Sequence, residues 1–78
     1  MTINLTSTPR QLAALPGNQI RFVYLQLLNG TNAKVSSEPQ AIIEGAGLSF
    51  SPSDGVMKFE WRGPMYVGGS GVLNYEII

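Results

Sequence analysis

The residues with the most chemical potential in this 78-residue chain are its five acids, and two of them could act together. Glu60 and Glu76 both lie in alternating segments, so their carboxylates could face each other from facing strands. Paired carboxylates act as general acid and base in glycoside hydrolysis. Their spacing matches no catalytic motif, and solvated charges on strand faces are the interpretation that we favour.

The chain contains no histidine and no cysteine. This excludes imidazole and thiolate metal ligands, disulfides, and Ser-His or Cys-His nucleophile pairs. The glycine run Gly68-Gly69-Ser70-Gly71 lacks the Lys-Ser/Thr pair and the helix that follow a phosphate-binding loop, so it predicts a hairpin loop. We therefore expect no catalytic residue, no metal, no cofactor and no enzymatic activity.

Aromatic side chains raise a second possibility, a stacking platform for sugars or bases. Trp61 and Tyr66 are the pair that could bind a host glycan. Proteins that bind single strands combine such rings with a basic groove, but the five basic residues here are scattered and balanced by five acids. We therefore expect no nucleic-acid binding, and packing in a core or subunit interface is the main alternative to a glycan site.

The surface is expected to carry few charges, because only 13% of the residues are charged against a usual share of about 25%. Such a surface lacks the repulsion that keeps monomers apart, which favours contact with other protein. A small neutral domain that is simply soluble is the alternative. No apolar run reaches the roughly 18 residues of a membrane span, so we expect no membrane partner.

The pattern of the chain predicts an all-β fold, a small antiparallel β-sandwich or barrel of about six to eight short strands. We expect one domain spanning residues 1–78, with residues 1–19 as a possible N-terminal arm. The arm could fold back or reach a neighbour, so Ile3 and Leu5 are candidate contacts. Residues 9–15 fit a short strand and a helical turn equally well. Residues 41–44 predict another short apolar strand.

The longest predicted strand, residues 20–28, is apolar on both faces. One face carries Phe22 and Tyr24, and the other carries Leu25 and Leu27. A strand of this kind is covered on both sides, and a second subunit could supply one cover. Asn29-Gly30 follows at once and predicts a hairpin.

Strict alternation continues in the C-terminal half. Met57, Phe59 and Trp61 share one face of their segment, opposite Val56, Lys58 and Glu60. We expect the first three to pack with one face of the last segment, which carries Leu73, Tyr75 and Ile77.

Four segments together resemble small virion proteins of tailed bacteriophages. They are residues 22–30, an apolar-glycine segment at 42–48, a Pro/Ser/Gly turn at 51–55 and the closing segment 65–75. The resemblance covers residues 20–78 and contains no invariant chemical motif. It implies a head decoration or cement protein, or a small piece of a tail or fibre.

From the resemblance and the composition we expect a non-enzymatic structural protein of the phage particle, located in the virion and made in the host cytoplasm. Its partners would be the major capsid protein or other virion proteins, and itself as a homo-oligomer, with a trimer as the first arrangement and a dimer as the second. Alternatives are a tail, baseplate or fibre component and a host-glycan-binding module. The candidate interface residues are Ile3, Leu5, Phe22, Tyr24, Leu25, Leu27, Trp61 and Tyr66.

Overall fold

Strands dominate the chain because β-branched and aromatic segments alternate with glycine- and proline-containing turns. The computed structural model describes residues 1–13 and 19–78. Its strands are β1 (Thr2–Leu5), β2 (Arg10–Ala13), β3 (Arg21–Leu27), β4 (Ala33–Ser36), β5 (Leu48–Phe50), β6 (Val56–Trp61), β7 (Met65–Gly69) and β8 (Gly71–Ile77). The described helices are α1 (Pro39–Ile43) and the single 3₁₀ turn η1 (Pro52–Asp54).

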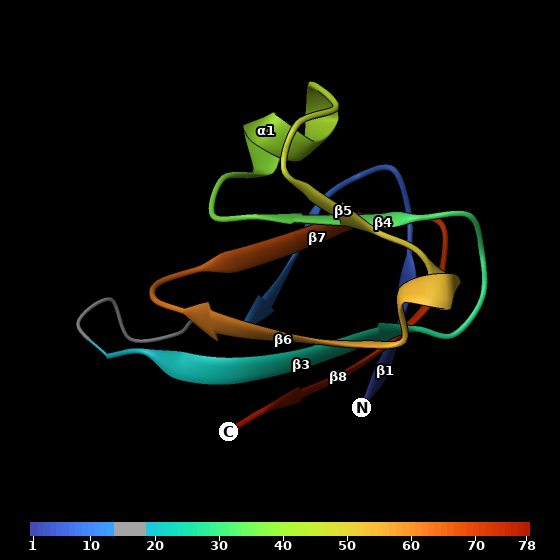
Figure 1. Cartoon of the computed structure of the whole chain (residues 1–78). Helices are drawn as coiled ribbons and strands as arrows, with labels where there is room; N and C mark the ends of the chain where they lie inside the picture. Colours follow the sequence, from blue (N-terminus) through green and yellow to red (C-terminus); the bar gives the residue numbers. More distant parts are fainter. Residues whose placement is uncertain (14–18) are drawn as a thin grey trace.

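The eight strands form two four-stranded antiparallel sheets that face each other as an open sandwich (Figure 1). Sheet I has the order β1-β8-β3-β6, and sheet II has the order β2-β7-β4-β5. Every described strand pair is antiparallel. The predicted antiparallel β fold is confirmed, and of the two architectures expected from the sequence, sandwich or barrel, the chain has the sandwich.

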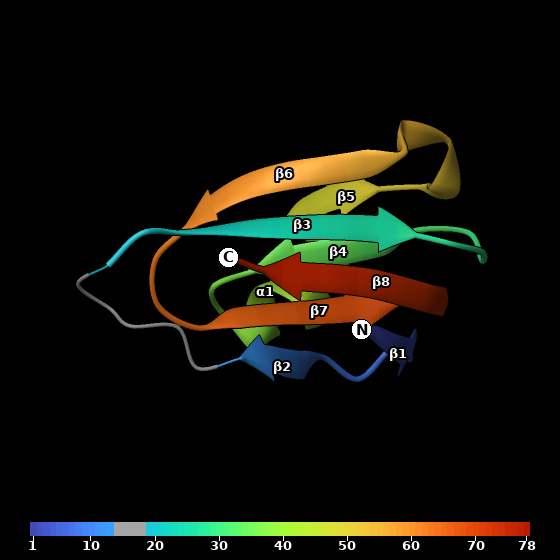
Figure 2. The ribbon, with the colours of Figure 1, turned by 90° about the horizontal axis from the view of Figure 1, so that it is seen from below.

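The two sheets correspond strand by strand. Each position in sheet I is matched in sheet II by a strand next to it in the chain: β1 with β2, β8 with β7, β3 with β4 and β6 with β5. Four corners therefore carry the chain from one sheet to the other at the same end of the sandwich (Figure 2). Backbone bonds link these corners: Gly69 N–H donates to the Thr6 carbonyl (2.9 Å), and Ser70 N–H donates to that of Asn32 (3.1 Å).

Asn29-Gly30 forms one of these corners, and the predicted hairpin was wrong. β3 belongs to sheet I and β4 to sheet II, so the two strands do not pair. The Asn29 side-chain oxygen accepts the Val72 N–H at 3.0 Å, and Gly30 has a φ of 99°. A positive φ is what makes Asn-Gly suitable for hairpins. Here the same torsion lets the chain turn out of one sheet and into the other.

The hairpin loop predicted at residues 68–71 was also wrong, for the same reason. β7 ends at Gly69 and β8 begins at Gly71, and the two strands lie in different sheets. Gly71 has a φ of 106°, and a Cβ at this position would overlap the backbone carbonyl of Asn29. Glycine is required because two corners touch backbone to backbone.

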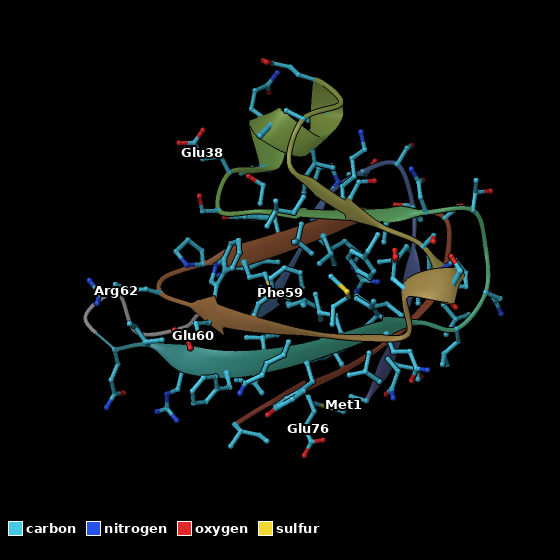
Figure 3. All side chains as sticks on the ribbon, in the orientation of Figure 1. Met1, Glu38, Phe59, Glu60, Arg62 and Glu76 are labelled. Carbon is cyan, nitrogen blue, oxygen red and sulfur yellow. The ribbon has the colours of Figure 1, made fainter. Side chains whose placement is uncertain are left out.

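The core lies between the sheets and follows the period of two. In β3, Val23, Leu25 and Leu27 are buried, while the residues between them are more exposed. Val35 and Val67 face them from sheet II and are fully buried. Burying each such side chain contributes about 1.5–3 kcal/mol, so this layer contributes strongly to the stability of the fold. Figure 3 shows Phe59 between the two layers.

Residues 41–44, predicted to be a strand, instead contribute to α1 and its C-cap. Pro39 occupies the first turn, where its missing N–H costs nothing, so it begins the helix three residues after β4 ends at Ser36. Ile42 is the buried residue of α1. It packs on the outer face of sheet II above Gly68, where a Cβ would come within 2.9 Å of the Ile42 side chain.

The N-terminal segment folds back onto its own domain. β1 pairs with β8, and β2 pairs with β7. The Met1 ammonium donates to the Tyr75 carbonyl at 3.0 Å. Of the two alternatives for residues 9–15, the structure has a strand over Arg10–Ala13, and residues 14 and 15 lie outside the described residues.

Candidate interaction surfaces

The outer face of sheet I has no covering element among the described residues. Its central strand, β3, turns Phe22 and Tyr24 outward because Val23 and Leu25 point into the core. The register with β6 and β8 then places the outward residues of all three strands side by side. We call this surface the bare face; it comprises Phe22, Tyr24, Gln26, Val56, Lys58, Glu60, Asn74, Glu76 and Ile78.

Apolar side chains mark one part of the bare face. Phe22 is 38% exposed, and Ile78 beside it is 60% exposed. Their backbones exchange hydrogen bonds of 3.3 and 2.9 Å, which fixes them on the same face. The Lys58 ammonium lies 4.4 Å from the centre of the Phe22 ring, a cation–π contact between neighbouring strands.

Polar side chains surround a shallow depression at the centre of the same face. Its volume is about 190 Å³, and it is bordered by Tyr24, Gln26, Val56, Asn74 and Glu76. Tyr24 lies opposite Lys58 on β6 and opposite Glu76 on β8. Figure 3 shows Glu76 pointing away from the sandwich. The face therefore mixes apolar rings with one cation and two carboxylates.

Four candidate interface residues turn out to serve the chain's own core. Leu25 is 0% exposed and Leu27 is 1% exposed, so neither has surface to offer a second subunit. Leu5 is buried in the same core, and Ile3 packs against it. The assignment of Leu25 and Leu27 to an interface was wrong because the second sheet of the same chain covers that face of β3. Phe22 and Tyr24, on the opposite face, remain candidates.

Trp61 and Tyr66 do not form one stacking platform. Trp61 packs against the core, meets Phe59 edge-on with ring centres 6.2 Å apart, and donates from Nε1 to the Pro64 carbonyl at 2.9 Å. Tyr66 lies between buried Met65 and Val67, so it points to the outer face of sheet II. The two rings therefore lie on opposite sides of a sheet.

The candidate carboxylate pair does not form either. Glu60 is on β6 and Glu76 is on β8, and β3 lies between these strands. Glu60 is opposite Phe22, while Glu76 is opposite Tyr24. Among the described residues, no group of three or more acids could hold a metal ion. In the same part of the chain, no helix is long and apolar enough to cross a membrane.

A groove beside α1 is the second surface feature, and the sequence analysis did not identify it. Its volume is about 540 Å³, and it lies on the outer face of sheet II. Its lining residues are Ser7, Thr8, Pro9, Asn32, Lys34, Ile42, Ile43, Gly68 and Gly69. The Lys34 ammonium at its border already donates to the Gly45 carbonyl at 2.7 Å. The only sequence signal was the pair Gly68-Gly69, which removes side chains from the floor of the groove.

Comparison with known proteins adds no assignment. No family model, no curated protein and no solved structure matches this chain.

Proposed function

We propose that this chain is a non-enzymatic structural protein of a phage particle that acts by binding protein surfaces, with head decoration or cement as its first role. The observation that best supports the proposal is the bare face. Phe22, Tyr24 and Ile78 form an outward surface of the kind found at the centre of protein interfaces, where aromatic residues are enriched.

The low charge of the chain supports the same role. Only 13% of the residues are charged, about half the usual share. Charged residues are depleted at interface cores because removing their water is costly. The resemblance of residues 20–78 to virion proteins supports a repeated protein lattice as the partner. On a lattice, many weak copies of one contact act together.

A tail, baseplate or fibre component is the nearest alternative. It would use the same β surface and would differ in its position on the particle. A glycan-binding module is less well supported because Trp61 and Tyr66 lie on opposite sides of sheet II.

The test is binding to phage heads prepared without the chain. Purified protein is mixed with these heads and with isolated tails, and bound protein is measured by co-sedimentation. A fixed number of copies on heads is the expected result. Binding to tails alone would assign the alternative role, and binding to neither would overturn the proposal.

Two exposed isoleucines provide a matched pair of variants. Ile78 on the bare face is 60% exposed, and Ile43 on α1 is 61% exposed. Ile78→Glu should weaken head binding at least about tenfold because it places a carboxylate in an apolar contact. Ile43→Glu should leave binding within about twofold, since surface changes outside a contact have small effects. Equal losses would show that the bare face is not the contact.

A further inference from the structure

β6 is the longest of the four edge strands of the two sheets. The other three edge strands are β1 with four residues, β2 with four residues and a register shift, and β5 with three. β6 has six residues and pairs with β3 without a bulge. Short strands and bulges are two of the usual protections of a sheet edge, and β6 has neither. Figure 2 shows β6 at the rim of sheet I, with β3 on one side only.

The hydrogen bonds of β3 identify which backbone groups of β6 are open. Phe22 exchanges hydrogen bonds with Ile78, so its N–H and C=O point toward β8. The alternate residue Val23 therefore points its groups toward β6, where its partner is Phe59. It follows that Met57, Phe59 and Trp61 bond to β3. Val56, Lys58 and Glu60 direct their backbone groups toward solvent.

The open residues include one cation and one anion, two positions apart. In an antiparallel pair of identical strands, hydrogen-bonded pairs must join these open residues. A twofold axis beside Phe59 places Lys58 opposite Glu60 of the second copy, and Glu60 opposite Lys58. An axis beside Lys58 would set two lysines opposite each other, and an axis beside Glu60 would set two glutamates. Like charges directly opposite destabilise a strand pair, so charge selects the first register.

The inner face favours the same register. Met57, Phe59 and Trp61 pack against the core but stay only half-buried, because β6 has no neighbour on its outer side. With the axis beside Phe59, the two Phe59 rings meet, and Met57 meets Trp61 of the second copy. Aromatic cross-strand pairs of this kind stabilise sheets. Glu60 has no side-chain partner in the part of the chain that the structure describes, so it is free to pair.

We propose that a second copy of this chain docks on β6, strand against strand, with a twofold axis beside Phe59. The two sheets I then join into one continuous antiparallel sheet, and their bare faces lie side by side on one surface. This inference goes beyond the proposed function, since it concerns the purified protein and needs no phage head. It assigns the dimer, the second of the two oligomers expected from the sequence.

The test uses the charge pattern, because reversing one charge at this axis creates two like-charge contacts. Lys58→Glu places two acids opposite each other twice, and Glu60→Lys does the same with two bases. Each variant alone should weaken the dimer at least about tenfold. An equimolar mixture of the two variants should recover association as a heterodimer, and the double variant K58E/E60K should recover it as a homodimer. Sedimentation velocity over a concentration series measures all four.

Glu76→Lys is the matched control, since it reverses a charge on the same face but on the central strand β8. It should leave the dissociation constant within about threefold, because exposed charges away from the contact have small effects. Circular dichroism confirms that each variant is folded. Hydrogen exchange gives an independent readout: amides of Lys58 and Glu60 should become protected as protein concentration rises.

Three results would overturn the proposal. One is a protein that stays monomeric at millimolar concentration. Another is a trimer whose association neither charge reversal weakens. The third is a dimer that the mixture of single variants does not restore, which would place the contact elsewhere. A failure to bind phage heads would not contradict this dimer, so each proposal can be refuted without refuting the other.

Discussion

The outer faces of the two sheets differ in what covers them. Sheet II carries α1, whose Ile42 is buried over Gly68. The Gly45 carbonyl, just after α1, accepts a hydrogen bond from the Lys34 ammonium of sheet II. Sheet I carries no such element among the described residues, and its bare face shows Phe22 and Ile78 to solvent. The same chain thus covers one sheet with its own residues and leaves the other exposed. An exposed apolar sheet face next to an open edge favours binding to other protein.

The largest expected effect tests which face of β3 is internal. Leu25→Glu places a carboxylate between the sheets, where water is absent, and should cost more than about 5 kcal/mol, the whole stability of many small domains. The neighbouring change Gln26→Glu, on the bare face, should leave the domain folded. Circular dichroism and urea denaturation check both. A folded Leu25→Glu variant would contradict the sandwich.

The next effect tests the cover of sheet II. Ile42→Ala removes the buried side chain of α1 and should lower the free energy of unfolding by about 2–3 kcal/mol. Ile43→Ala, one residue along and 61% exposed, should change it by less than about 0.5 kcal/mol. Urea denaturation measures both values. Equal losses would mean that α1 does not cover the sheet through Ile42.

A smaller effect tests how closely α1 approaches the sheet. Gly68→Ala adds a Cβ within 2.9 Å of the Ile42 side chain. The helix must shift outward, and we expect a loss of about 1–2 kcal/mol from overpacking. Combining Gly68→Ala with Ile42→Ala should cost less than the sum of the single changes, because the smaller side chain removes the clash. Additive losses in denaturation curves would contradict this contact.

The smallest effect on stability belongs to the bare face. Phe22→Ala removes the ring beneath Lys58 and should cost no more than about 1 kcal/mol, the usual value of an exposed cation–π contact. The same variant should weaken binding to phage heads more than it weakens the fold. Thermal denaturation and head co-sedimentation together check this. A large loss of stability with unchanged binding would assign Phe22 to the core instead.

Alternation predicted the faces of the strands well. Met57, Phe59 and Trp61 lie in the core layer with Leu73, Tyr75 and Ile77, as their spacing of two residues indicates. Leu48 and Phe50 show the limit of this signal. They share a face by spacing, yet Phe50 is buried and Leu48 is exposed, although Leu48 lies opposite the buried Val35, because β5 is a three-residue strand at the edge of its sheet.

The candidate site was only partly predictable. Phe22 and Tyr24 were correctly placed on one face, but the pattern of β3 did not reveal which of its two apolar faces the chain itself would cover. Trp61 and Tyr66 appeared to be near neighbours because they are five positions apart, and the passage of the chain from sheet I to sheet II separated them.

By itself, the sequence determined the class of the fold, the two faces of each strand and the scarcity of charge, because these depend on residue type and a local period of two. Only the tertiary structure decided that Asn29-Gly30 and Gly69-Ser70-Gly71 are corners, that residues 39–43 form a helix over sheet II, and that β6 ends at an open edge. A positive φ is a local property that serves a hairpin and a corner equally. Which strands become neighbours depends on how distant segments bury their apolar faces together, and no local pattern encodes that.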